Sequence, residues 1–178
     1  MKPIKEKQAE AFTSMKGDFG YKSKFAAPRL VKVVVSATTG RAKDKNRNEL
    51  VMDRLAKITG QKPSLRAAKK SIAAFKVREG DKIGVAVTLR GARMMGFLDK
   101  FFNVVIPRMR DFRGFEKKSV DEIGNITLGL KEQTIFPETA DEEVRDLFGM
   151  AVTIVTTSKS KKEAEKFFEV IGVPFKKA

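Results

Sequence analysis

A strict alternation of apolar with small or polar side chains at residues 82–90 is the sequence feature that most constrains the fold. The apolar set is Ile83, Val85, Val87 and Leu89. The other set is Gly84, Ala86, Thr88 and Arg90. Successive strand residues point to opposite faces of a sheet, so this pattern predicts a strand with one buried and one open face. The open face suits the close approach of a large flat ligand, and an ordinary solvated sheet face explains the pattern equally well.

Helical and strand patterns alternate along the rest of the chain. Apolar residues at helical spacing predict helices over residues 3–17, 47–59 and 92–106, and the capping box Ser160–Glu163 predicts the start of a last helix. Gly17 and Gly20, Gly60, Pro107 and Gly172 are expected to end these four helices in turn. Residues rich in β-branched side chains predict strands over 29–36 and 150–158. We therefore expect a single domain, residues 1–178, that combines helices and strands in layers.

The charge is strongly basic and unevenly distributed. The chain has 37 Lys and Arg against 22 Asp and Glu, a net charge of +15. Residues 1–118 hold 29 of the basic and 11 of the acidic side chains, whereas residues 119–178 are net acidic. An excess of this size indicates a polyanionic partner, which we expect along the first two thirds of the chain.

Catalysis has little support in the sequence. Cysteine and histidine are both absent, which excludes thiolate and imidazole chemistry and the usual zinc ligands. The acidic cluster of residues 141–146 does not make a metal site, because consecutive residues do not share a helix face. No phosphate-binding glycine motif occurs. We expect no catalytic residue, metal or cofactor.

Two basic segments are candidates for the polyanion contact. Residues 61–80 form a long connection that we interpret as a basic loop, with the cations Lys62, Arg66, Lys69, Lys70, Lys76 and Arg78. Long basic loops on a rigid scaffold are commonly functional. The second segment is 107–114, in which three Arg surround one Asp and one Phe. A salt-bridged loop explains that second segment as well as an RNA contact does.

The same segments resemble a known family, the large-subunit ribosomal protein L-five family of the bacterial type. The resemblance lies in Thr59–Pro63, Phe75–Gly80, Val87–Gly91, Arg110–Gly114, Ile135–Glu138 and Val155–Thr157. Order and spacing hold from about Phe19 to Phe175. The family fold is α+β: an antiparallel β-sheet with helices packed on one face, and an open face and loops that bind RNA.

The resemblance implies a structural role in the ribosome, without enzymatic activity. Members bind 5S rRNA and 23S rRNA in the central protuberance and help to attach 5S rRNA to the large subunit. Carried over by position, the 5S rRNA contacts are Gln61, Thr88, Arg90, Ser36 and Lys32. Thr88 and Arg90 lie on the open strand face derived above from the alternation.

The family's long loop reaches P-site tRNA. Its residues here are Arg66, Lys69, Lys70 and Ser71 within residues 64–74. Further residues are expected to face rRNA: Lys76, Arg78, Arg93, Arg108, Arg110 and Arg113. The family also meets neighbouring ribosomal proteins, including a small-subunit protein at an intersubunit bridge. The expected location is ribosome-bound in the cytoplasm.

Two stretches depart from the family pattern. Relatives have an Asn where this chain has Ser36, which keeps a hydroxyl and loses the amide. The turn that carries an exposed aromatic residue in relatives reads Val120–Ile126 here.

Two other classes of protein remain as alternatives. An RNA-processing enzyme would need carboxylate or metal chemistry, for example at Asp141 or Glu143. A membrane-surface protein would need a strongly amphipathic basic helix. The charged segment Met1–Glu6 lacks the apolar core of a signal peptide, which favours a cytosolic protein.

Overall fold

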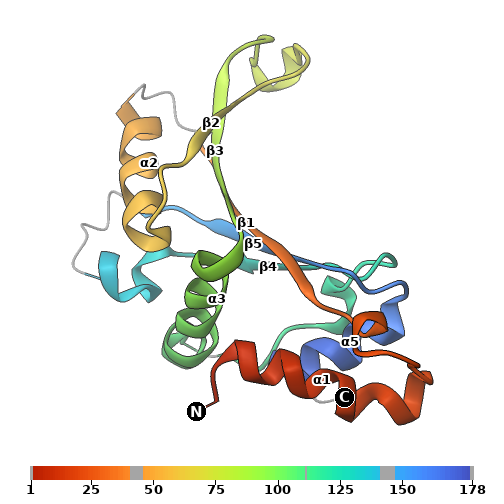
Figure 1. Ribbon diagram of the computed structural model, residues 1–178. Coiled ribbons are helices and arrows are strands. Elements are labelled where there is room, and N and C mark those ends of the chain that lie inside the picture. Colours follow the sequence, from red (N-terminus) through yellow and green to blue (C-terminus); the bar gives the residue numbers. More distant parts are fainter. Residues whose placement is uncertain (1, 41–45, 111, 141–146, 177–178) are drawn as a thin grey trace. The chain divides into compact units, whose positions relative to one another are not determined.

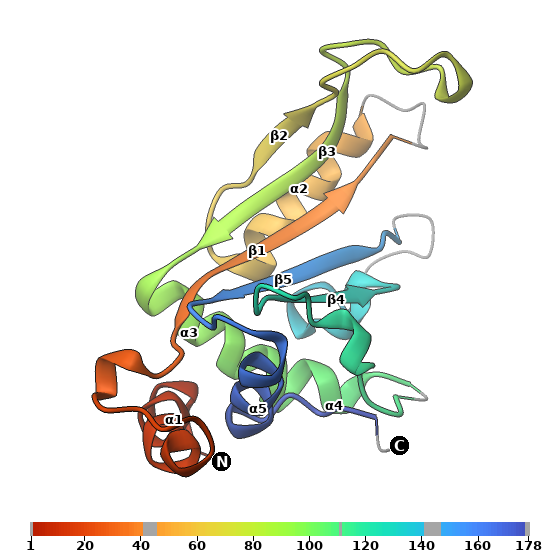
Figure 2. The same cartoon turned by 90° about the vertical axis from the view of Figure 1, so that its right-hand side faces the viewer.

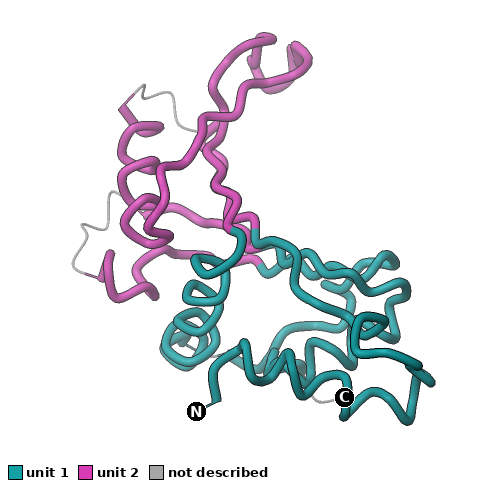
Figure 3. The backbone as a smooth tube through the Cα atoms, viewed as in Figure 1, with its two compact units in different colours: residues 1–33, 90–128, 153–178 teal, residues 34–89, 129–152 magenta. Residues whose placement is uncertain are grey.

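The computed structural model describes residues 2–40, 46–110, 112–140 and 147–176. They belong to two units, coloured separately in Figure 3. Unit 1 comprises Met1–Val33, Arg90–Leu128 and Thr153–Ala178, and unit 2 comprises Val34–Leu89 and Gly129–Val152. Each unit is therefore assembled from segments that are distant in the sequence.

Five strands form one sheet, in the spatial order β2-β3-β1-β5-β4 (Figure 1, Figure 2). They are β1 (Leu30–Thr38), β2 (Ser64–Ala67), β3 (Lys82–Leu89), β4 (Ile126–Leu130) and β5 (Met150–Thr156). Beyond β1, the Thr39 N–H donates to the Ile83 carbonyl near the start of β3 (2.9 Å). Beyond β5, the Thr157 N–H donates to the Arg29 carbonyl just before β1 (3.0 Å). The end of each strand thus meets the start of its neighbour, which confirms the expected α+β fold with an antiparallel sheet.

Burial alternates along the strands. In β5, Val152 and Ile154 are buried, whereas Thr153 between them is half-exposed. In β4, Leu128 is buried and its neighbour Thr127 is exposed. One face of these strands therefore packs in the apolar core, and the other carries small and polar side chains.

In the part of the chain that the structure describes, four longer helices and one short one accompany the sheet. They are α1 (Ile4–Phe19), α2 (Asn46–Thr59), α3 (Gly91–Lys100), α4 (Ile106–Arg108) and α5 (Lys161–Ile171). In unit 1, α1 packs against α5 and α3; in unit 2, α2 packs against β3 and β2 (Figure 2). Val51, Leu55 and Ile58 are buried on α2, as the helical spacing predicts. Among the described residues, no helix is long and apolar enough to cross a membrane.

Three helices end in glycines with a left-handed backbone. Gly20 closes α1 (φ 63°), Gly60 follows α2 (φ 66°) and Gly172 closes α5 (φ 102°). These three ends confirm the predictions. Gly17, also predicted to end the first helix, instead lies inside α1. An interior glycine costs only about 1 kcal/mol, too little to stop a helix anchored by the buried Met15.

The helix expected over residues 92–106 runs further than predicted. After α3, residues Phe101–Val105 form a π-helical turn, in which the Ile106 N–H donates to the Phe101 carbonyl five residues earlier. Pro107 then lies in the first turn of α4, a helix position at which proline is tolerated. The prediction that Pro107 stops the helix is therefore wrong. Of the two adjacent methionines on α3, Met94 is buried and Met95 is half-exposed.

The segment interpreted as a basic loop contains a strand. β2 pairs antiparallel with β3, with Ser64 opposite Ala86 and Leu65 opposite Val85. Beyond β2, an isolated bridge joins Ile72 to Val77. The sequence of β2, Ser-Leu-Arg-Ala, has no β-branched residue, so its extended form comes from pairing with β3 and not from local propensity.

Candidate nucleic-acid interface

Gln61 and Thr88 meet in unit 2. Gly60 turns the chain out of α2. The Thr59 hydroxyl donates mainly to the Leu55 carbonyl of α2 (2.6 Å), and the Gln61 carbonyl lies at 3.2 Å from the same hydroxyl. The Gln61 side chain then donates from Nε2 to the Thr88 carbonyl near the end of β3 (3.1 Å). Both side chains are half-exposed. The structure thus brings together two of the predicted 5S rRNA contacts, which lie 27 residues apart.

Ser36 and Lys32 share a face of β1. Each is half-exposed, whereas Val33 and Val35 between them are fully buried. Alternation along a strand therefore places the hydroxyl and the ammonium on the side away from the core. Neither side chain has a hydrogen-bond or ion-pair partner among the described residues. Ser36 belongs to unit 2 and Lys32 to unit 1.

Arg90 is the first residue of unit 1 after β3. It occupies the N-cap position of α3 with an extended backbone (φ −140°, ψ 164°) and is exposed. Because it lies two residues after Thr88, the strand alternation continues to it. Its guanidinium makes no ion pair within the part of the chain that the structure describes. An exposed, unpaired guanidinium can form paired hydrogen bonds with phosphate.

The open face of β3 is smaller than the sequence predicted. Gly84 and Ala86 are buried, so only Thr88 and Arg90 of the four residues present themselves to solvent. A Cβ placed on Gly84 would lie 3.2 Å from the Ala37 carbonyl oxygen. The missing side chain at Gly84 thus allows close packing of the neighbouring backbone.

The β2–β3 hairpin exposes its cations. Arg66, Lys69, Lys70, Lys76 and Arg78 are all exposed, and none makes an ion pair with another described residue. The hairpin tip extends beyond β2 and β3 (Figure 1). Phe75 (74%) and Ile72 (47%) are exposed there.

Ser71 has a structural role within the hairpin. Its hydroxyl oxygen accepts a hydrogen bond from the Glu79 N–H (2.9 Å), and Asp81 accepts one from the Arg78 N–H (2.7 Å). Lys76 adopts the left-handed backbone region (φ 52°), the one described non-glycine residue to do so. These features fix the course of the tip and leave its cationic side chains outside.

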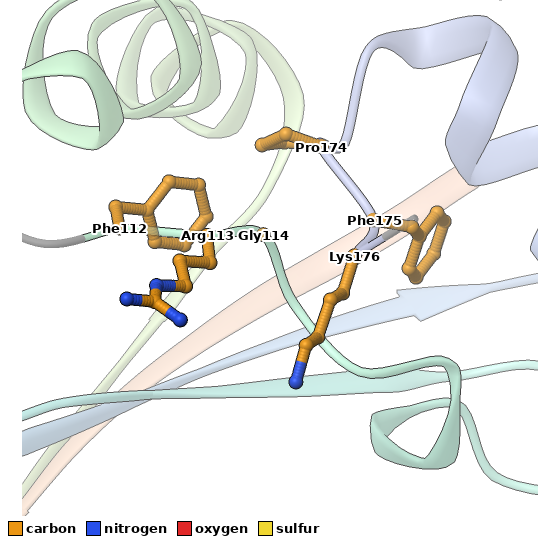
Figure 4. Close-up of a pocket in the computed structure, with 6 residues that line it drawn as sticks. All are labelled: Phe112, Arg113, Gly114, Pro174, Phe175 and Lys176. Atoms are coloured by element: carbon orange, nitrogen blue, oxygen red, sulfur yellow. The ribbon is translucent and has the colours of Figure 1, made fainter. Parts of the chain in front are cut away.

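The predicted arginines of unit 1 are all exposed. Arg93 lies in the first turn of α3, Arg108 ends α4, and Arg110 and Arg113 follow. Arg113 borders a shallow recess of about 480 Å³ (Figure 4). The recess is lined by Phe112, Arg113, Gly114, Pro174, Phe175 and Lys176. Asp111, the expected partner of an arginine, lies outside the described residues, as does the acidic cluster of residues 141–146.

Two polar features were described incompletely from sequence. Thr156 of the strand predicted over 150–158 is buried. Its hydroxyl donates to the Gly124 carbonyl (2.6 Å). Thr127, on a strand that the sequence patterns above did not identify, lies 3.0 Å from Thr153, hydroxyl to hydroxyl. The apolar-polar alternation of residues 126–130 is the signal that would have found that strand.

An antiparallel α+β fold with many exposed cations is typical of the class of proteins that bind a polyanion. Two family models match the chain: "Ribosomal protein L5" over residues 23–78, and the C-terminus of the same ribosomal family over residues 82–175. The chain belongs to the ribosomal protein L5 family, whose members are structural and non-enzymatic components of the ribosome.

Similar proteins cover almost the whole chain. The large ribosomal subunit protein uL5 of Kosmotoga olearia is 48% identical over 98% of this chain and 97% of its own length. The protein of the same name from Heliobacterium modesticaldum is 51% identical over 99% of each chain. That of Thermotoga maritima is 46% identical over 98% of this chain and 96% of its own. The resemblance identified from motifs is thereby confirmed.

Proposed function

We propose that this protein is a structural constituent of the large ribosomal subunit that binds 5S rRNA and 23S rRNA in the central protuberance. It is bound to the ribosome in the cytoplasm and helps to attach 5S rRNA to the subunit. Family membership supports the ribosomal role. The observation that best supports the 5S contact is the hydrogen bond that the Gln61 amide donates to the Thr88 carbonyl. Thr88 lies two residues before the exposed Arg90.

The proposed 5S contact follows from the chemistry of these groups. The Thr88 hydroxyl can exchange hydrogen bonds with a ribose 2′-OH or a base edge. The Arg90 guanidinium can bind a phosphate through two parallel hydrogen bonds. Ser36 and Lys32 add a hydroxyl and an ammonium on β1. The Gln61 amide fixes the backbone at the end of β3, so it orients Thr88 in addition to any contact of its own.

The hairpin is proposed to contact P-site tRNA. Arg66, Lys69 and Lys70 supply exposed charge for phosphates, and Ser71 shapes the tip. The arginines at 93, 108, 110 and 113, with Lys76 and Arg78, are proposed to face rRNA. We also propose that neighbouring ribosomal proteins, one of them at a bridge to the small subunit, are partners.

The experiment that tests this function is a comparison of 5S rRNA with an unrelated structured RNA of similar length. Affinity of the purified chain is measured for both across a salt series. Release of counterions predicts that log affinity falls with log salt concentration with a slope of about −0.7 to −0.9 per phosphate neutralised. A preference for 5S rRNA that persists at physiological salt supports the proposal. Equal affinities that both vanish at moderate salt would contradict it.

A further inference from the structure

The turn that follows α1 presents a phenyl ring almost entirely to solvent. Phe25 is 93% exposed, more than any other large apolar side chain among the described residues. It lies in unit 1, in the short 3-10 turn Lys24–Ala26. Single exposed apolar residues are common on protein surfaces. Two features distinguish Phe25: hydrogen bonds that order the backbone of its turn, and the basic residues that flank it in the sequence.

Hydrogen bonds and burial anchor the turn on both sides. The Phe25 N–H donates to the Ser23 hydroxyl oxygen (3.3 Å), and the Ala26 N–H donates to the Ser23 carbonyl (3.0 Å). After the turn, Ala27 is buried. Before it, the Tyr21 hydroxyl donates to the Glu163 carboxylate of α5. The ring is therefore held outward by an ordered backbone, which lowers the entropy lost when a ligand binds it.

The charged residues nearest to Phe25 in the sequence are all positive. Lys22, Lys24 and Arg29 are exposed, and none makes an ion pair with a described residue. The sequence has no Asp or Glu between Asp18 and Asp44. A pocket on a protein partner would favour apolar or mixed neighbours around such a ring, because charged residues are depleted at the centres of protein interfaces. A ring flanked in the sequence by exposed cations matches the pattern of single-stranded nucleic-acid binding, in which aromatic side chains stack on bases and cations follow the backbone.

We propose that Phe25 is a stacking platform for an unpaired RNA base, with Lys22 and Lys24 on the flanking phosphates. Neither the charge pattern of the sequence nor the family resemblance singled out this surface. It adds a second RNA contact to the proposed function and uses none of the residues assigned to 5S rRNA, the tRNA-contacting hairpin or the other rRNA contacts.

The test uses two synthetic RNAs with the same number of phosphates. Both are ribose–phosphate chains of about 12 nucleotides, within the usual footprint of single-strand binders. One carries a single adenine at its centre, and the other carries no base. The full chain is expected to bind the adenine RNA about tenfold more tightly or better. Phe25→Ala removes that preference, whereas Phe25→Trp retains it.

The chain has no tryptophan, so Phe25→Trp also supplies a local optical probe. Stacking of adenine on the indole is expected to quench its fluorescence, while the base-free RNA leaves it unchanged. The matched control is Ile123→Trp, at a residue that is 70% exposed and follows Asp121 and Glu122 in the sequence. No quenching by adenine is expected there.

Lys22→Gln combined with Lys24→Gln is expected to weaken binding of both RNAs equally. It is also expected to reduce the magnitude of the slope of log affinity against log salt by about 0.7 for each phosphate released. Equal affinity of the unmodified chain for the two RNAs would overturn the proposal. The Phe25 ring would then be assigned to contact with a protein partner. An adenine preference that survives Phe25→Ala would also overturn it. Arg90→Ala separates this inference from the proposed function. That variant is expected to lose affinity for 5S rRNA and to keep the preference for the adenine RNA.

Discussion

Arg90 is the residue at which charge, exposure and strand geometry coincide. Its guanidinium has no ion-pair partner among the described residues, so binding a phosphate would break no existing salt bridge there. Arg90→Ala is expected to weaken 5S rRNA binding by about 1–3 kcal/mol, as for loss of a charged hydrogen bond. A binding titration against 5S rRNA measures this.

The matched control for Arg90 is Lys162→Ala, which removes one exposed positive charge from α5. It is expected to change affinity only slightly, because long-range charge effects are screened at physiological salt. If both variants lose affinity equally, Arg90 acts through net charge alone and does not belong to the site.

Gly84 is the residue whose side chain matters by its absence. An added methyl group would press on the Ala37 carbonyl oxygen at 3.2 Å. Gly84→Ala is therefore expected to lower the free energy of unfolding by about 1–3 kcal/mol, the usual cost of overpacking. Urea denaturation measures it. Gly129→Ala is the control in β4, where a Cβ meets nothing within 4 Å; there the change is expected to be neutral or slightly stabilising. Equal effects at both positions would contradict the packing role of Gly84.

Elements with strong periodicity were predictable from sequence. The helix α2 and the strands β1, β3 and β5 were located to within about three residues, because their apolar faces are buried as the spacing requires. β2 was not, since Ser64–Ala67 is extended only through its pairing with β3. The prediction that Pro107 ends the helix failed because the π-turn at Phe101–Val105 shifts the backbone hydrogen bonds from i→i−4 to i→i−5 just before the proline. Tertiary pairing and a helix irregularity, which leave no local pattern, account for these misses.

The sequence predicted the residue types of the candidate site better than it predicted how many of those residues are exposed. Charge and alternation selected Thr88, Arg90 and the hairpin cations, and all of them are at least partly exposed. The burial of Gly84 and Ala86 could not be foreseen, because small residues fit an open face and a tight strand contact equally well. Phe25 was missed because no periodicity marks a residue in a three-residue turn.

The hairpin and the sheet face are separate functional elements in the proposed function. Lys69→Glu with Lys70→Glu is expected to impair P-site tRNA binding to reconstituted ribosomes and to leave 5S rRNA affinity largely intact, because like charges repel tRNA phosphates only at the tip. Lys161→Glu with Lys162→Glu is the control, with the same change of net charge on α5. Loss of 5S binding in the hairpin variant would contradict the separation.

The junction of α1 and α5 contains the chain's single tyrosine. Burial, reinforced by the hydrogen bond to Glu163, raises the pKa of Tyr21 well above its ordinary value of 10.0. Ultraviolet titration of the phenol is therefore expected to show a midpoint above 10.0 in the folded protein. The stability from this contact is fully present below the unfolded pKa and is lost as pH rises through the folded one. Tyr21→Phe removes that pH dependence; an unshifted midpoint would contradict the contact.

At the scale of the whole molecule, the charge is concentrated where the proposed contacts lie. Residues 1–118 carry every cation assigned to RNA or tRNA, and residues 119–178 are net acidic. Long-range attraction to RNA thus draws mainly on the first two thirds of the chain.

The π-turn at Phe101–Val105 amounts to a one-residue insertion that the helix has absorbed. In an α-helix each residue advances the chain by about 100° around the axis. Deleting Asn103, which is only half-buried, would let the turn close as ordinary α-helix and rotate every later position by that angle. Arg108 and the segment after it would then face another direction. A single codon within this turn thus sets the direction in which Arg108, one of the residues proposed to face rRNA, is presented.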